Sequence, residues 1–166
     1  MSKLKIVVTG PVCAGKTTFI HSLAESPPAT TEQRVRNPSD KSKTTVALDF
    51  GRATIGGHPV NLFGTPGQAR FHYMREILVD GTDGLVLLVP SDQKNAIEKT
   101  QELMMPLTAR MDSPIVVGIT RTDLAQRPIH EKIQQSYGSR ALEIKQIDAR
   151  EEDHCRYLVT TLINQG

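Results

Sequence analysis

The sequence has few of the features that mark secreted, membrane-spanning or nucleic-acid-binding proteins. It contains two cysteines, Cys13 and Cys155, which are too few for a disulfide framework and fit a reducing compartment. The formal net charge of +2 is too small to indicate nucleic acid or an acidic membrane surface as a partner. No apolar run approaches the length of a membrane span. We therefore expect a soluble cytoplasmic protein that binds no nucleic acid.

The two ends of the sequence also lack targeting signals. Residues 1–5 lead directly into a predicted strand, which leaves no room for a signal peptide. Residue 2 is Ser2 rather than the glycine needed for myristoylation, and residues 162–166 hold no cysteine for prenylation. We expect no direct membrane anchor.

The pattern of apolar residues predicts alternating strands and helices in one domain, residues 1–166. Strands are expected at 6–8, 45–52, 59–63, 84–89, 115–119 and 142–147, and helices at 16–25, 70–79, 95–110, 128–137 and 152–163. Residues 26–43 are polar and proline-rich, and are expected to form a long surface loop that acts as a mobile lid. This order predicts a three-layer, doubly wound α/β fold. Its six-stranded sheet should be parallel except for strand 45–52, which a turn at Gly56-Gly57 joins to strand 59–63 as a hairpin.

The segment between the first strand and the first helix matches the phosphate-binding P-loop pattern, Gly10-x-x-x-x-Gly15-Lys16-Thr17. Backbone N–H groups of such a loop surround phosphates, and the following helix presents its positive end to the same anion. Lys16 would reach the β- and γ-phosphates and the Thr17 hydroxyl would bind Mg²⁺. The alternative, a chance glycine-rich turn, does not explain the strand before and the helix after. The expected nucleotide-binding residues here are Gly10, Val12, Cys13, Ala14, Gly15, Lys16, Thr17 and Thr18.

Three later segments narrow the possible classes of P-loop protein. They are Thr65-Pro66-Gly67-Gln68-Ala69-Arg70-Phe71, Thr120-Arg121-Thr122-Asp123 and Asp148-Ala149-Arg150. In this order they resemble the second switch, the guanine motif and the Ser-Ala-Lys loop of Ras-like small GTPases. The run Phe-Gly-Thr-Pro-Gly-Gln at residues 63–68 is most similar to the prokaryotic members of that family. The resemblance implies a small G-domain that binds GTP and GDP with Mg²⁺.

The resemblance also assigns roles in base recognition. Asp123 would accept hydrogen bonds from the guanine ring N1–H and exocyclic amine, which adenine cannot supply, although capping the following turn is an alternative for this residue. Arg121, in place of the family's lysine, would lie over the base, and Thr120 replaces the family's asparagine. Ala149 would offer its N–H to the guanine O6. Gly67, Asp148 and Arg150 complete the expected nucleotide-binding set.

For hydrolysis, the resemblance implies Mg²⁺ binding by Thr17 and by a first-switch threonine, either Thr44 or Thr45. We favour Thr45 because its distance along the chain from the second-switch segment resembles that in ADP-ribosylation-factor-type members of the family. Lys16 would neutralise phosphate charge and Gln68 would orient the attacking water. Gly64 stands where the family has an aspartate that helps to hold Mg²⁺.

Asp49 is the candidate substitute for that missing aspartate. Its side chain should point to the opposite face of its strand from Leu48 and Phe50. A surface carboxylate without a metal role is the alternative.

The expected function is a guanine-nucleotide switch that slowly hydrolyses GTP and signals to a partner. Resemblance suggests a Roadblock-type regulatory protein as that partner. Gly64, Val12 and the altered guanine motif also permit a second hypothesis, a nucleotide-binding interaction module with little catalysis. A third hypothesis, an ATP-dependent kinase, would need an arginine-rich lid and an acceptor site, and neither is evident in the sequence.

Overall fold

The computed structural model describes residues 2–26, 29–36, 43–66, 72–124 and 129–165, and for residues 29–36 and 43–47 it describes the backbone alone. Seven strands form one sheet in the order β2-β3-β4-β1-β5-β6-β7. The strands are β1 Leu4–Thr9, β2 Ala29–Arg36, β3 Lys43–Ile55, β4 His58–Gly64, β5 Gly84–Pro90, β6 Ile115–Thr120 and β7 Ala141–Gln146. The helices are α1 Lys16–Leu23, α2 His72–Val79, α3 Ala96–Thr108, α4 His130–Tyr137 and α5 Glu152–Ile163.

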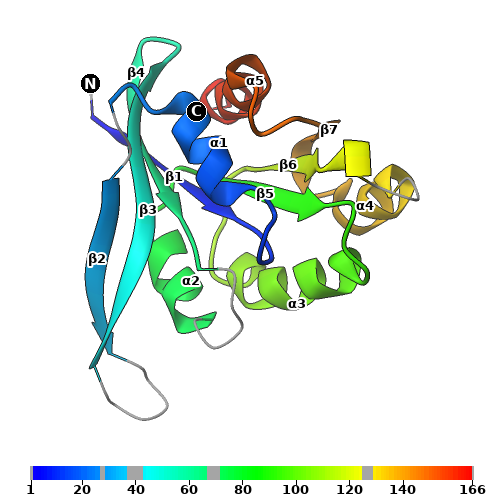
Figure 1. Ribbon diagram of the computed structural model, residues 1–166, viewed down its shortest axis with the longest axis horizontal. Coiled ribbons are helices and arrows are strands. Elements are labelled where there is room, and N and C mark those ends of the chain that lie inside the picture. Colours follow the sequence, from blue (N-terminus) through cyan, green and yellow to red (C-terminus); the bar gives the residue numbers. More distant parts are fainter. Residues whose placement is uncertain (1, 27–28, 37–42, 67–71, 125–128, 166) are drawn as a thin grey trace.

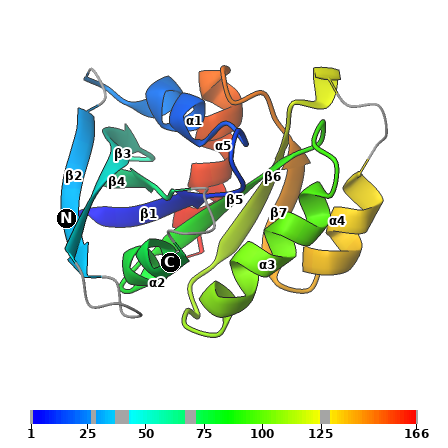
Figure 2. The same cartoon turned by 60° about the horizontal axis from the view of Figure 1, so that its bottom comes forward.

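Helices cover both faces of this sheet and complete three layers. Helices α1 and α5 lie on one face, and α2, α3 and α4 lie on the other (Figures 1 and 2). The central strands β1, β5 and β6 pair in parallel, as does β4 with β1, whereas β3 is antiparallel to both of its neighbours. The three-layer, doubly wound, mostly parallel fold predicted from the sequence is confirmed.

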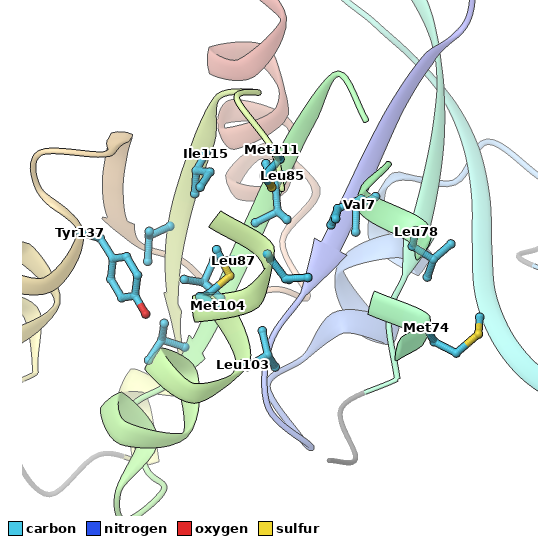
Figure 3. Packing of buried hydrophobic residues seen from close by; sticks show 14 of the residues in the cluster. Val7, Met74, Leu78, Leu85, Leu87, Leu103, Met104, Met111, Ile115 and Tyr137 are labelled. Atoms are coloured by element: carbon cyan, nitrogen blue, oxygen red, sulfur yellow. The ribbon is translucent and has the colours of Figure 1, made fainter. Parts of the chain in front are cut away.

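The core consists of one apolar cluster on each face of the sheet. Strands β5 and β6 are buried along their whole length, as the continuous apolar runs of central parallel strands require. On the α2–α3–α4 face, Leu85 and Leu87 of β5 belong to the same cluster as Leu103 and Met104 of α3 (Figure 3). The opposite cluster includes Phe19 and Ile20 of α1. Packing of α1 against the sheet fixes the start of this helix beside the end of β1.

The six predicted strands are all present, and the predicted hairpin is correct. Ile55 pairs with His58, and the intervening Gly56 and Gly57 have φ of 58° and 80°, the positive values that a two-residue type I′ turn requires at both positions. The predicted helices begin and end within about two residues of those observed, apart from the starts of the 70–79 and 128–137 helices, which lie outside the described part.

One expectation was wrong. Residues 29–36, predicted to belong to a loop, form β2, which pairs with β3 from Ala29↔Phe50 to Arg36↔Lys43 and adds a seventh strand at the sheet edge. The sequence prediction relied on apolar residues, but an edge strand is held by backbone hydrogen bonds to its neighbour and can be polar. Apolar periodicity therefore gives no signal for it.

No helix within the described residues is long and apolar enough to span a membrane.

Candidate nucleotide-binding site

The phosphate loop runs from Gly10 to Gly15, between the end of β1 and the start of α1. A side chain at Gly10 would place its Cβ 2.4 Å from the Leu88 carbonyl oxygen, so the close approach of the loop to β5 requires glycine. Gly15 precedes α1 with φ of 102°, a left-handed conformation that favours glycine. The loop therefore turns tightly onto the positive end of α1, which is the arrangement that binds phosphate.

Lys16 lies inside this loop. Its Nζ donates to the carbonyl oxygens of Gly10 at 2.8 Å and Pro11 at 2.7 Å, which leaves one of its three protons for an anion. Burial, together with the positive charge of Arg75, lowers the pKa of Lys16 to about 8. Arg75 is itself buried in α2 and donates to the Pro66 carbonyl oxygen at 3.1 Å. A phosphate at the loop would supply the negative charge that this lysine lacks.

Thr17 and Asp49 form a pair beside the loop. The Thr17 hydroxyl donates to Asp49 Oδ2 at 2.5 Å, across the gap between α1 and β3. Asp49 lies opposite Gly64 in the β3–β4 pair, and its side chain points toward α1, away from the face that Leu48 and Phe50 occupy. This orientation is the one that strand alternation predicts.

These two oxygen ligands fit a magnesium ion bound together with phosphates. Mg²⁺ prefers oxygen ligands and in phosphate sites is held through one or two carboxylates, substrate phosphates and water. No group of three or more His, Cys, Asp or Glu side chains that could hold a metal occurs among the described residues.

A cavity of about 440 Å³ opens next to the phosphate loop. Its lining comes from the phosphate loop and the start of α1, from residues 120–124 after β6, and from residues 146–150 after β7, together with His154 of α5. Because β6 and β7 are parallel neighbours, their carboxyl ends bring the two predicted base-binding segments to the same edge of the sheet.

Thr120 ties the cavity to the phosphate loop. Its side chain is 1% exposed, and its hydroxyl donates to the Ala14 carbonyl oxygen at 2.7 Å. The hydroxyl is the only side-chain donor of a threonine, and this bond uses it. Thr120 therefore links the predicted base-binding segment to the phosphate loop.

Arg121 and Asp123 differ in how they are held. Arg121 has φ of 59°, and its Nε donates to Asp92 Oδ2 at 2.9 Å, which raises the pKa of the arginine. Asp123 lies in the short 3-10 turn Thr122–Leu124 and forms no side-chain hydrogen bond or ion pair within the described part of the chain. It therefore caps no described turn, and it lines the cavity.

The segment after β7 is fixed by its own side chains. Arg150 donates to both carboxylate oxygens of Asp148, at 2.9 and 2.8 Å, and this contact lowers the pKa of Asp148 to about 2. The Asp148 N–H donates to His154 Nδ1 at 3.0 Å. The Ala149 carbonyl oxygen accepts from the Ser22 hydroxyl, which fixes this residue against α1.

The segment Ser91-Asp92-Gln93, which follows β5, is a part of the site that the sequence motifs did not identify. The Ser91 hydroxyl donates to the Thr120 carbonyl oxygen at 2.8 Å, and Gln93 Nε2 donates to the Val12 carbonyl oxygen at 2.7 Å. With the Asp92–Arg121 pair, these contacts connect the phosphate loop to the base-binding segment. Three polar residues directly after a central buried strand are the signal that could have revealed them.

Several predicted residues are not brought to this site or lie outside the description. The backbone of Thr45 lies in β3 opposite Arg34, four residues and about 13 Å along the strand from Asp49. The Thr45 backbone is therefore well separated along β3 from Asp49, the residue that contacts Thr17. Gly67 and Gln68 lie outside the described residues. Val12 lies within the phosphate loop, but its side chain is 49% exposed to solvent.

Comparisons with known proteins identify a family and several similar proteins. A family model described as "Conserved hypothetical ATP binding protein" matches residues 29–164. An uncharacterized protein of Methanocaldococcus jannaschii, MJ1339, is 34% identical over 122 residues, covering 74% of this chain and 72% of that protein. Ras-related protein Rab-21 of Bos taurus is 25% identical over 174 residues, covering 95% of this chain and 73% of that protein.

A solved structure, the cytosolic domain of FeoB from L. pneumophila, has a TM-score of 0.70 and 18% identity to this chain. The match covers 96% of this chain and 67% of that chain. At this identity the similarity shows a common fold.

Proposed function

Because the chain belongs to the family described as conserved hypothetical ATP binding proteins and is related to the small GTPases, we propose that it is a guanine-nucleotide switch. It binds GTP and GDP with Mg²⁺ and slowly hydrolyses GTP. The observation that carries the proposal is the position of Asp123, which lines the cavity beside the phosphate loop and pairs with no residue that the structure describes.

Asp123 decides between the two purines. Guanine presents two donors, the ring N1–H and the exocyclic amine, to a carboxylate, and its O6 can accept from the Ala149 N–H. Adenine has a lone pair instead of a hydrogen at ring N1. It would therefore leave a carboxylate oxygen without a donor, and the N1 lone pair would repel that oxygen. The chemistry of the cavity therefore favours GTP, although the description of the family refers to ATP.

The phosphates lie along the loop in this proposal. The loop N–H groups and Lys16 neutralise their charge, and Lys16 needs no large movement because its Nζ is already inside the loop. Thr17 and Asp49 hold the Mg²⁺, which when bound neutralises charge on the β- and γ-phosphates. Gln68 orients the water for in-line attack.

Switching requires residues 29–36 and 43–45 to change their pairing. Thr45 must leave its position opposite Arg34 to reach the cation, so GTP and the β2–β3 pairing compete for this segment. A partner that reads this segment would distinguish the GTP state from the GDP state. Resemblance to prokaryotic small GTPases is the support for proposing a Roadblock-type regulatory protein as that partner.

A second candidate is a nucleotide-binding interaction module with little catalysis. The position of Thr45 in β3, away from Thr17, favours it, since the first-switch ligand is then missing. Single-turnover GTP hydrolysis separates the two candidates: Gln68→Leu slows a GTPase and leaves the background rate of the module unchanged.

Calorimetric titration of nucleotide-free protein with GTP, GDP and ATP, each with and without Mg²⁺, tests the proposal. We expect tight binding of both guanine nucleotides, no heat with ATP, and tighter GTP binding with Mg²⁺. Asp123→Ala should weaken GTP and GDP binding and keep the thermal unfolding of the wild type. Binding of ATP as tight as that of GTP would reject guanine recognition and leave a general P-loop nucleotide site.

A further inference from the structure

Two arginines line the same cavity as Asp123, yet neither pairs with it. Arg121 is two residues before Asp123 and follows β6, whereas Arg150 follows β7. Guanidinium groups form strong bidentate pairs with carboxylates, so a free arginine here would be a competitor for Asp123. In this structure the Asp123 carboxylate forms no such pair with any described residue.

Each arginine is instead held by a different carboxylate. Arg121 Nε donates to Asp92 Oδ2 at 2.9 Å. Arg150 donates to both oxygens of Asp148 through its side chain, and its backbone N–H donates to Asp148 Oδ1 at 3.0 Å. These four charged residues therefore form two ion pairs, and Asp123 takes part in neither of them.

Asp123 is close enough for the competition to matter. Its negative charge contributes to raising the pKa of both arginines, after the larger contributions from Asp92 and Asp148. Both guanidinium groups are thus within electrostatic reach of Asp123, and arginine side chains are long enough to reorient when a partner is removed.

We propose that Asp92 and Asp148 are positioning residues that hold Arg121 and Arg150 away from Asp123 and so keep the base-reading carboxylate free. This inference rests on the proposed guanine recognition by Asp123. Removing either counter-carboxylate allows the released arginine to pair with Asp123, and a guanine base must then displace that pair before it binds. Nucleotide affinity falls although Asp123 and Ala149, which are proposed to recognise the base, are unchanged.

The matched test uses Asp92→Asn and Asp148→Asn, each alone and combined with the loss of its arginine, Arg121→Gln or Arg150→Gln. Asparagine keeps the size of the side chain and an acceptor oxygen. Because exposed ion pairs are weak, we expect each single Asp→Asn change to weaken GDP binding about three- to tenfold. Binding of inorganic pyrophosphate, which needs the phosphate loop alone, should not change.

The double variants give the decisive result. If the released arginine blocks Asp123, Asp148→Asn with Arg150→Gln binds GDP more tightly than Asp148→Asn alone, and the Asp92 pair behaves in the same way. The weakening in the single variants should also shrink in high salt, which screens the competing pair. Asp80→Asn, which breaks the Asp80–Arg110 pair outside the cavity, is the control and should leave GDP binding unchanged.

Two outcomes overturn the inference and one overturns its premise. Unchanged GDP affinity in both single variants means that the arginines do not compete for Asp123. Double variants that bind no better than the singles mean that the aspartates act by orienting the arginines against the base. A wild-type protein that binds no guanine nucleotide rejects the proposed function itself, and the inference with it.

Discussion

Asp49 and Gly64 face each other across the β3–β4 pair, and a Cβ at position 64 would lie 3.2 Å from the Asp49 Cβ. The same Cβ would lie 3.0 Å from the Ile20 Cδ1 atom. An aspartate at position 64, where the small GTPases have one, would therefore crowd both residues. The neighbouring strand instead supplies a carboxylate, and that carboxylate reaches Thr17. The absence of a side chain at Gly64 therefore leaves room for the carboxylate of Asp49.

This arrangement predicts that Asp49→Ala reduces the effect of Mg²⁺ on GTP affinity. The variant removes the carboxylate that contacts Thr17, and loss of one charged group near a bound cation costs about tenfold or more in affinity. Titration with GTP in Mg²⁺ and in a chelator measures the effect, and the affinity in the chelator should match that of the wild type. An Asp49→Ala protein with full Mg²⁺ dependence would show that Asp49 has no role at the cation.

Thr120→Val should reduce both stability and nucleotide affinity. Valine has nearly the same shape but leaves the buried Ala14 carbonyl oxygen without its donor, which costs about 1–3 kcal/mol. Chemical denaturation measures the change, and looser nucleotide binding should follow because the phosphate loop loses this support. Thr120→Ser keeps the hydroxyl and is the control. Equal stability of the valine and serine variants would mean that the Thr120–Ala14 bond contributes nothing.

The main elements of the fold could be predicted because their signals are local. Residues 84–89 and 115–119 are continuous apolar runs that read as buried parallel strands, and Gly56-Gly57 is a turn signal with a defined geometry. The phosphate loop is equally local, since its glycines, lysine and threonine stand within eight residues. The orientation of Asp49 followed from strand alternation alone.

What the sequence did not reveal depends on contacts between distant segments. The strand at 29–36 exists because β3 offers its backbone as a partner, and nothing in the residues 29–36 themselves indicates that pairing. Asp92 and Gln93 contact Arg121 and Val12 because the ends of β1, β5 and β6 lie close together in space. In the sequence, Asp92 and Arg121 are 29 positions apart. Residue patterns along the chain predict single helices and strands. The β2–β3 pairing and the Asp92–Arg121 contact depend instead on how these helices and strands pack together.

The lowered pKa of Lys16 predicts that nucleotide affinity falls as the pH rises above about 8. Bound phosphates stabilise the protonated lysine, so its pKa is higher in the complex than in the free protein. Below about pH 8 both states are protonated and the affinity does not depend on this group. Between the two pKa values binding requires uptake of a proton, and affinity falls by up to tenfold per pH unit.

Calorimetry of GDP binding at pH 9 in two buffers of different ionisation enthalpy measures this proton uptake. Guanosine, which has no phosphate to interact with Lys16, is the control for titration of the base itself. No proton uptake with GDP beyond that with guanosine would contradict a lowered pKa at Lys16.

The position of Thr45 predicts that GTP changes hydrogen exchange in β2 and in the first part of β3. Its movement toward the cation requires the backbone bonds between residues 29–36 and 43–50 to open or shift, so amides in these segments should exchange faster with a non-hydrolysable GTP analogue and Mg²⁺ than with GDP. The second half of β3, residues 51–55, pairs only with β4 and is an internal control. If protection of residues 29–36 is the same in both states, Thr45 stays in β3 when GTP binds. The protein would then bind nucleotide without a first-switch ligand, and the module with little catalysis would be the better description, because the γ-phosphate could not be sensed through this segment.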